Sequence, residues 1–321
     1  MSAAYWVCRR ELAILGRAPV AYVIGGLFLV VQGVAFAGLV GAMSDPRRPA
    51  PLGALLEGQL AGTLLTWALQ LVVVTLLGMR AIADDVRGGG WEALVTAGVS
   101  ERAAVIGKWL AALAIYAVAW LPTSVYLAIV AIYRTDPGGW DRGAIAAGYL
   151  GAIAIGGALL AWAIAASAAA RSALAAGALG FAALIAWLIA GELCALWPAL
   201  ATEHPRAAAA IDAISLRALA TELARGYVGA RAVIVIAGAT ATGLSLAIAL
   251  ACAGRRRRRE VATRLAATAA IAIAAIAGAV LASRHPRGLD VSAGARNTLG
   301  PATAAVLAEL PGPGRVVIVE P

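Results

Sequence analysis

The chain has 321 residues, of which 62% are hydrophobic and only 13% charged. Soluble domains carry about 25% charged residues, so this composition argues against a soluble globular protein. Its hydrophobicity argues equally against intrinsic disorder. The formal net charge is +9, and in a membrane protein such positive charge is first of all a signal of topology. No basic face is interleaved with stacking aromatic residues, so we expect no nucleic-acid partner.

The first predicted element is an amphipathic helix over residues 3–17. Helical spacing gathers apolar side chains on one face and turns the basic ones elsewhere: Tyr5, Cys8, Leu12 and Leu15 against Arg9, Arg10 and Arg17. This pattern is typical of a helix that lies in the membrane interface. Pro19 ends the helix, because the residue before a proline avoids the helical region.

A helix that crosses the membrane needs about 20 mostly apolar residues. Six runs meet this requirement: residues 20–43, 60–79, 109–133, 144–169, 173–196 and 232–253. Glu192 is the charged residue within them, and it lies near the end of its run, where it can reach the interface. The sequence therefore predicts an all-α polytopic membrane domain over residues 1–260. Its first run is too long for a cleaved signal peptide.

The segment between the second and third runs, residues 78–108, is much longer than a turn requires. It holds both acidic and basic residues, then a triple glycine that permits a sharp backbone break, and then a short apolar helix face. The charged residues are Asp84, Asp85, Arg87 and Glu92. The triple glycine is Gly88, Gly89 and Gly90, and the apolar face consists of Trp91, Leu94 and Val95. Such a segment is suited to meet a protein partner at the cytoplasmic surface. A solvated charged loop is the alternative interpretation.

The stretch from Trp197 to Arg231 is too polar to span the membrane. Leu216, Leu219 and Leu223 nevertheless recur at helical spacing within it. We therefore expect an extracytoplasmic helix that rests on the bilayer, and the alternative is a solvated loop containing a short helix.

Five consecutive arginines, Arg255–Arg259, follow the sixth run. Positive charge gathers in short cytoplasmic segments. An N-terminus in the cytoplasm places just over half of the 26 Lys and Arg residues in such segments. A seventh, weaker helix rich in Ala and Ile is predicted within residues 261–283. The odd number of spans then places the C-terminus on the extracytoplasmic side.

No catalytic machinery is visible in the sequence. Gly107-Lys108-Trp109 lacks both the upstream glycine and the hydroxyl residue of a phosphate-binding loop. Cys8, Cys194 and Cys252 are too far apart for a metal-ligand spacing. We therefore expect neither an enzyme nor a bound metal or cofactor. An ion-coupled carrier is disfavoured, because it needs more ionisable groups at mid-depth.

Four stretches are similar, in this order, to motifs of one transporter family. They are Arg10-Glu11-Leu12 with the Pro19-Val20-Ala21-Tyr22 that follows, the loop from Asp84 to Leu94, Gly107-Lys108, and Leu223-Ala224-Arg225-Gly226-Tyr227-Val228. The chain resembles the membrane subunit of ABC-2 type exporters, and within them the permeases grouped with gliding-motility-associated ABC transporters. It departs from the family pattern at Gly90, Ala93 and Gly98, where Thr, Leu and Pro are expected.

The resemblance implies a six-helix ABC-2 type transmembrane domain in a bacterial cytoplasmic membrane. It implies export driven by a separate cytoplasmic ABC ATPase, which binds ATP and Mg, and a second permease copy or a homologous permease as partner. The resemblance implies an ATPase-coupling loop that contains Asp84, Asp85, Arg87, Gly88, Gly89, Gly90, Trp91, Glu92 and Leu94. It implies that the interfacial helix contributes Arg9, Arg10, Glu11 and Pro19. It also implies an extracytoplasmic motif formed by Arg225 and Gly226. The alternative is a membrane anchor or mechanical element of an extracytoplasmic gliding or envelope machine, with no transported solute.

Residues 284–321 are similar to the opening of the extracytoplasmic accessory domain of these permeases, and predict a short α/β segment. A helix is expected to start at Pro301, followed by a strand at Arg315–Val319. A single strand is not stable alone, so we expect it to pair elsewhere, for instance with an extracytoplasmic accessory protein, or the chain to be a truncated piece. The Ala, Gly, Leu and Ile of the spans suit a lipid-like cargo, but close helix packing selects the same residues.

Overall fold

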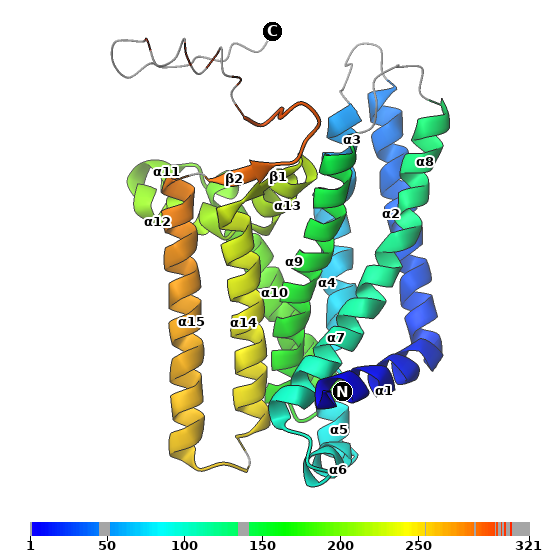
Figure 1. Cartoon of the computed structure of the whole chain (residues 1–321), viewed down its shortest axis with the longest axis vertical. Coiled ribbons are helices and arrows are strands. Elements are labelled where there is room, and N and C mark those ends of the chain that lie inside the picture. The colour runs from blue at the N-terminus through cyan, green and yellow to red at the C-terminus, as the bar shows by residue number, and fades with distance from the viewer. Residues whose placement is uncertain are drawn as a thin grey trace.

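The computed structural model describes residues 2–44, 52–133, 141–253, 255–285 and 287–298, together with residues 300, 303, 305 and 309. Long helices run side by side, and one end carries a helix that lies across their axes (Figure 1). The first half contains α1 (Ala3–Arg17), α2 (Pro19–Met43), α3 (Leu52–Leu60), α4 (Leu64–Gly78), α5 (Ala83–Arg87), α6 (Gly90–Thr96), α7 (Glu101–Trp120), the 3-10 turn η1 (Leu121–Thr123) and α8 (Ser124–Tyr133). The second half contains α9 (Arg142–Ala169), α10 (Ala173–Leu196), α11 (Ala199–Glu203), α12 (Pro205–Ala213), α13 (Leu216–Ala224), β1 (Tyr227–Gly229), α14 (Ala230–Ala251), α15 (Arg258–Arg284) and β2 (Gly288–Asp290).

Seven helical segments among the described residues are long and apolar enough to cross a membrane. They are Ala21–Met43, Leu65–Arg87, Glu101–Tyr133, Arg142–Ala169, Ala173–Leu196, Ala230–Ala251 and Arg258–Arg284. The prediction of an all-α polytopic membrane protein is confirmed. Helix α9 is the central span, since 72% of its apolar window is buried inside the chain, whereas only 11% of the α15 window is buried.

The second and third spans differ from the runs seen in the sequence. The second is broken between α3 and α4, and there the Thr63 hydroxyl accepts a hydrogen bond from the Thr66 amide at 3.4 Å. Such a cap satisfies a backbone donor that a helix start leaves free. The third begins eight residues before the predicted start at 109, because the Ser100 hydroxyl caps α7 by accepting from the Ala103 amide at 3.3 Å. A search for charge-free runs places that start too late, since the first turns of α7 contain charged residues.

The two ends of the bundle are chemically different. One end, called here the loop end, holds α1, α5, α6 and the turn between α14 and α15 (Figure 1). The other, called the β end, holds α11, α12, α13 and the two short strands (Figure 1). The N-terminus lies at the loop end and α15 finishes at the β end, as an odd number of spans requires. The arginine run Arg255–Arg259 therefore shares its end with the 80–100 loop.

Helix α13 was predicted to rest on the bilayer, and that prediction is wrong. Leu216, Leu219 and Leu223 are buried, with 2%, 0% and 5% of their surface exposed, and they belong to the main hydrophobic core. Their apolar face packs on the bundle because α9 and α10 offer glycines there: Gly151 faces Leu223, and Gly191 faces Ser215. The amphipathic pattern is real, but protein covers it instead of lipid.

The strands β1 and β2 form an antiparallel pair, in which Tyr227 is opposite Asp290 and Gly229 is opposite Gly288. This pair fastens the segment after α15 to the start of α14. The predicted strand Arg315–Val319 and the helix start at Pro301 lie outside the described residues.

Candidate functional site

The 80–100 loop folds into two short helices, α5 and α6, separated by a sharp break. Gly89 makes the break with φ +74°, a left-handed conformation that residues with a Cβ rarely adopt. Helix α5 is tethered to α9, because the Ile82 and Ala83 amides both donate to the Ser167 hydroxyl at 3.0 Å. That hydroxyl in turn donates to the Met79 carbonyl at 2.8 Å. The loop is therefore a fixed structure attached to the central span.

Helix α6 is anchored by Trp91, whose surface is only 1% exposed. The indole packs in a cluster with Val105 of α7 and Ile164 of α9, while Val95 is partly buried against the same cluster. Trp91 therefore faces the bundle. The exposed surface of α5, α6 and the break between them includes Val86, Arg87, Gly88, Gly89, Glu92 and Ala93, and Leu94 is half-buried. A partner that reaches this loop meets charged and glycine residues, with Trp91 beneath them.

The most unusual contact in the molecule is a buried cluster of three charges on three different elements. The Lys108 Nζ of α7 lies 2.8 Å from the Glu11 Oε1 of α1 and 2.7 Å from the Asp85 Oδ2 of α5. The Lys108 side chain is 2% exposed, against 12% for Glu11 and 20% for Asp85. Leaving such a charge buried without partners is costly, so the three elements must hold their relative positions. We call these residues the charge triad.

A close approach of two helices makes the triad possible. A Cβ on Gly107 would lie 2.7 Å from both the Ala4 carbonyl oxygen and the Val7 Cβ, so only glycine lets α1 pack here on α7. Val7 is 3% exposed and lies one helical turn before Glu11, on the side of α1 that faces α7. The side chains of Arg9 and Arg10 are exposed. The buried side of α1 thus differs from the apolar face predicted from the sequence, since Tyr5 is 46% exposed.

The arginine run also reaches the loop. Arg255 lies 2.7 Å from Glu92 of α6, and Arg256 lies 3.4 Å from Glu101 of α7. The hydrogen bond from Arg255 lowers the pKa of the Glu92 carboxyl below its ordinary value. Asp84 pairs with Arg80 and Arg87 within the loop itself. Apart from Glu101, whose side chain is 14% exposed, the side chains in these pairs are about a third exposed or more, and such surface pairs contribute about 0–1 kcal/mol each.

The Arg225-Gly226 motif, predicted to be extracytoplasmic, lies at the β end, far from the triad. Gly226 has φ +83°, and its carbonyl accepts from the Val291 amide at 2.9 Å. The Asn297 side chain donates to the Arg225 carbonyl at 2.9 Å, while the Arg225 guanidinium lies 3.0 Å from Glu57. The motif therefore holds the turn that follows β2 against the top of the bundle.

Asp290 organises this turn. Burial raises the pKa of its carboxyl, but hydrogen bonds from Ser292 and Asn297 outweigh burial and lower the pKa to about 2. Asp290 Oδ1 accepts from the Ser292 hydroxyl at 2.6 Å, and Oδ2 accepts from the Asn297 amide at 2.8 Å. Among the residues that the structure describes, no group of three His, Cys, Asp or Glu side chains is placed to hold a metal ion.

Lys108 and Ser167 are the functional candidates that sequence reasoning missed. The sequence motifs contain Lys108 only as part of Gly107-Lys108. A usable signal was present, because it is the single lysine of the chain and stands directly before a long apolar run. A cation at such a position needs an acidic partner. Nothing local marks Ser167 among the many small residues of its run.

Comparisons with known proteins add one finding. No curated protein matches the chain. A family model described as ABC-2 family transporter protein matches residues 66–220. The matched region begins in α4 and ends in α13, so it contains α5 and α6, Lys108 and Ser167. The middle of this multi-pass membrane protein is therefore similar to an ABC-2 family transporter protein domain.

Proposed function

We propose that the chain is the membrane-spanning permease subunit of an ATP-driven exporter. In this proposal a separate cytoplasmic ABC ATPase binds ATP and Mg, a second permease copy or a homologous permease completes the transporter, and the protein resides in a bacterial cytoplasmic membrane. The loop end faces the cytoplasm and the β end faces outward. The family match supports a transporter role, and the basic residues gathered at the loop end support this orientation.

The observation that carries the proposal is the charge triad. Lys108 joins the loop helix α5, the interfacial helix α1 and the third span α7 through two ion pairs of 2.7 and 2.8 Å. A movement of the docked loop changes the position of Asp85, and Lys108 must follow or lose one of its two partners while its charge stays buried. The motion therefore passes directly to α7 and α1. Helix α1 directly precedes the first span, and it also packs on α7. A movement of α1 therefore acts on both the first and the third span.

The docking part of this proposal is tested on the exposed residues of the loop. Arg87→Glu combined with Glu92→Arg reverses the charges that a partner would meet, and both side chains are mostly solvent-exposed. We expect the variant to fold normally and to lose co-purification with the co-expressed ATPase subunit. Arg284→Glu at the β end is the matched control and keeps the ATPase bound. Retention of the ATPase by the double variant would contradict docking at this loop.

The coupling part is tested separately with Lys108→Met. The exposed surface of α5 and α6 is unchanged in this variant, so we expect the ATPase to remain bound. Stimulation of its ATP hydrolysis by the permease should fall, because the loop is no longer linked electrostatically to α7. Unchanged stimulation with the ATPase bound would contradict the role of the triad.

Membership of the gliding-motility-associated subgroup and the presence of an accessory domain rest on the sequence motifs alone. They remain part of the proposal, and so does the export direction. The alternative of a mechanical anchor predicts a complex whose ATP hydrolysis does not respond to any solute. A screen of candidate solutes against the reconstituted complex separates the two functions.

A further inference from the structure

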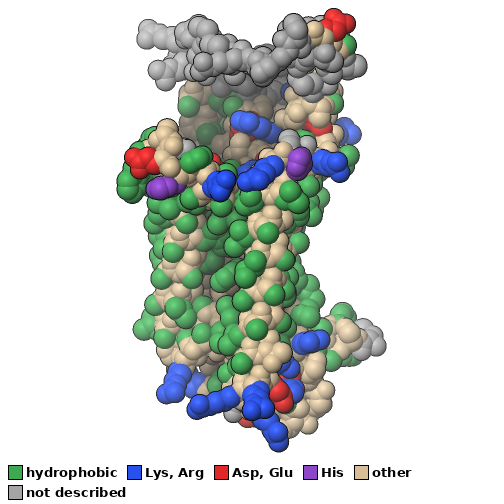
Figure 2. Space-filling model, turned by 90° about the vertical axis from the view of Figure 1, so that its left-hand side faces the viewer, with side chains coloured by type: hydrophobic (Ala, Val, Ile, Leu, Met, Phe, Trp, Pro, Cys, Tyr) green, Lys and Arg blue, Asp and Glu red, His purple; other side chains and the backbone are tan. Residues whose placement is uncertain are grey.

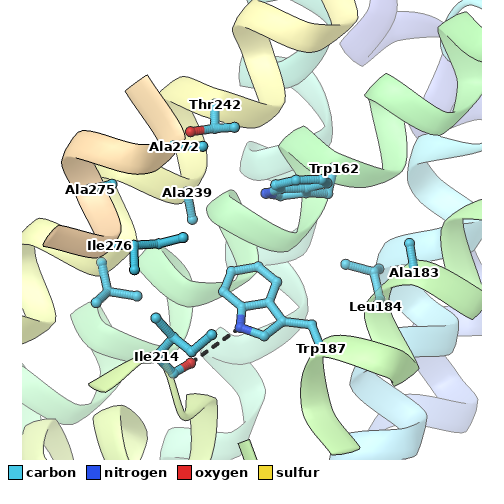
Figure 3. Close-up of a pocket in the computed structure, with 11 residues that line it drawn as sticks. Trp162, Ala183, Leu184, Trp187, Ile214, Ala239, Thr242, Ala272, Ala275 and Ile276 are labelled. Atoms are coloured by element: carbon cyan, nitrogen blue, oxygen red, sulfur yellow. Dashed lines mark hydrogen bonds between the residues drawn. The ribbon is translucent and has the colours of Figure 1, made fainter. Parts of the chain in front are cut away.

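A groove opens on the flank of the bundle, between α10 and α15. It has a volume of about 290 Å³, and helices α9, α10, α14 and α15 contribute its walls. Figure 3 shows the two indoles of Trp162 and Trp187 on one side and alanine side chains of α14 and α15 on the other. The rings pack edge to face, with their centroids 6.2 Å apart. The lining is almost entirely apolar, which in a membrane protein is a surface for hydrocarbon.

The groove is preformed at the end nearer the β end. The Trp187 Nε1 donates to the Ile214 carbonyl at 3.2 Å, a bond that fixes the indole against the turn between α12 and α13 (Figure 3). The other polar atoms of the lining are the Thr242 hydroxyl, which donates to Gly238 at 2.7 Å, and the Trp162 Nε1, which is buried without an acceptor among the described residues.

The shape of the groove matches an extended chain lying along the membrane normal. Val235 and Thr242 line it from one face of α14, and seven residues of helix span about 10 Å at 1.5 Å per residue. On α15 the lining includes Ala272 and Ile276. Ile276 precedes the helix end at Arg284 by eight residues, or about 12 Å. The groove thus extends from Ile214 at the β end toward mid-membrane, and its α15 wall begins about two turns from the end of that helix.

Basic side chains stand above this groove. Arg206 lies in the first turn of helix α12, which packs against both α10 and α15; Arg284 ends α15, and Arg287 follows it. All three are exposed, and none has an ion-pair partner among the described residues. Figure 2 shows Lys and Arg side chains at this end, with His and acidic side chains among them, above a hydrophobic flank; Lys and Arg also gather at the loop end. Cationic charge over a hydrocarbon slot matches an amphiphile that has an anionic head and an apolar tail.

We propose that this groove binds one acyl chain of an anionic membrane phospholipid, whose phosphate lies against Arg284, Arg287 and Arg206. The lipid comes from the leaflet at the β end, and it fills the space between α15 and the α9–α10 pair. Helix α15 is then attached to the bundle partly through lipid, in keeping with how little of its surface the chain itself buries. This site is independent of the ATPase docking proposed above, and it stands or falls separately.

The tail-binding part is tested with variants that fill the groove. The full chain, purified in detergent and delipidated, is incubated with phosphatidylglycerol, and bound lipid is counted by native mass spectrometry. Ala183→Phe with Ala239→Phe places two rings in the groove at positions that are not fully buried. We expect bound lipid to fall by about tenfold, a change equal to the loss of two buried methylenes. Ala182→Phe is the matched control, because Ala182 is exposed on α10 and does not line the groove.

The headgroup part is tested without touching the core. Arg284→Gln with Arg287→Gln should lower phosphatidylglycerol binding by about tenfold while leaving phosphatidylcholine binding nearly unchanged. Arg102→Gln at the loop end is the control and should change neither. Equal lipid binding by the parent and the filled variant would overturn the proposal. So would dissociation of a protein dimer in the filled variant without loss of lipid, because that result would assign the groove to a contact between copies.

Discussion

Replacing Lys108 by methionine removes the cation of the charge triad while preserving the length and the apolar stem of the side chain. Glu11 and Asp85 are then left facing each other without a counter-charge. Removing one partner of a buried ion pair costs about 3–5 kcal/mol, chiefly because the remaining charge stays desolvated. Glu11 and Asp85 are 12% and 20% exposed, so water screens part of their repulsion. We therefore expect a loss at the lower end, about 3 kcal/mol.

The measurement is the free energy of unfolding of the full chain in mixed micelles, followed by tryptophan fluorescence as denaturing detergent is added. The informative comparison is the neutral triple variant, Glu11→Gln, Asp85→Asn and Lys108→Met. It removes all three charges and should recover to within about 1 kcal/mol of the parent, since replacing a whole buried ion cluster is often neutral. Arg102→Met, an exposed site on the same helix α7, is the control and should leave stability unchanged.

Two outcomes would refute this reasoning. A cost of less than about 1 kcal/mol for Lys108→Met would show that the triad behaves like an ordinary surface pair. A neutral triple variant as unstable as Lys108→Met alone would show that packing of the lysine stem, and not charge, holds α1, α5 and α7 together.

Three further predictions concern single positions. In Gly107→Val the new Cβ would lie 2.7 Å from the Val7 Cβ, so α1 is forced away from α7 and proteolysis of this N-terminal helix should accelerate. Gly16→Val is the control, because a Cβ at Gly16 meets no neighbour within 4 Å. Gly226→Ala should cost about 1–2 kcal/mol of unfolding free energy for a Cβ at φ +83°, whereas little loss would show that the turn relaxes. The pKa of Asp290 is lowered to about 2 from 3.8, so its contribution to stability is complete above pH 3.8 and disappears as the pH falls through about 2. Amide exchange in the turn after β2 measures this contribution, and Asp290→Asn should abolish the protection at every pH.

Much of the architecture follows from the sequence alone. Membrane spans are predictable because every crossing helix must shield its own backbone in hydrocarbon, so length and apolarity suffice to find it. The break at the triple glycine is predictable for a local reason too, since a left-handed backbone at Gly89 needs a residue without a Cβ. The arginine run marks its end of the bundle by charge alone.

The contacts that form the candidate site depend on tertiary structure and are not visible in the sequence. Glu11, Asp85 and Lys108 are far apart in the chain, and only the packing of α1 on α7 at Gly107 brings them together. Trp91 and the leucines of α13 carry the amphipathic pattern expected of exposed apolar faces, yet both are covered by protein. A one-dimensional pattern records that a face is apolar, but not whether lipid, a partner or the chain itself covers it. Which of these covers the face depends on which helices become neighbours. For this reason the charge triad is covered by protein, whereas the proposed lipid groove stays open to the membrane.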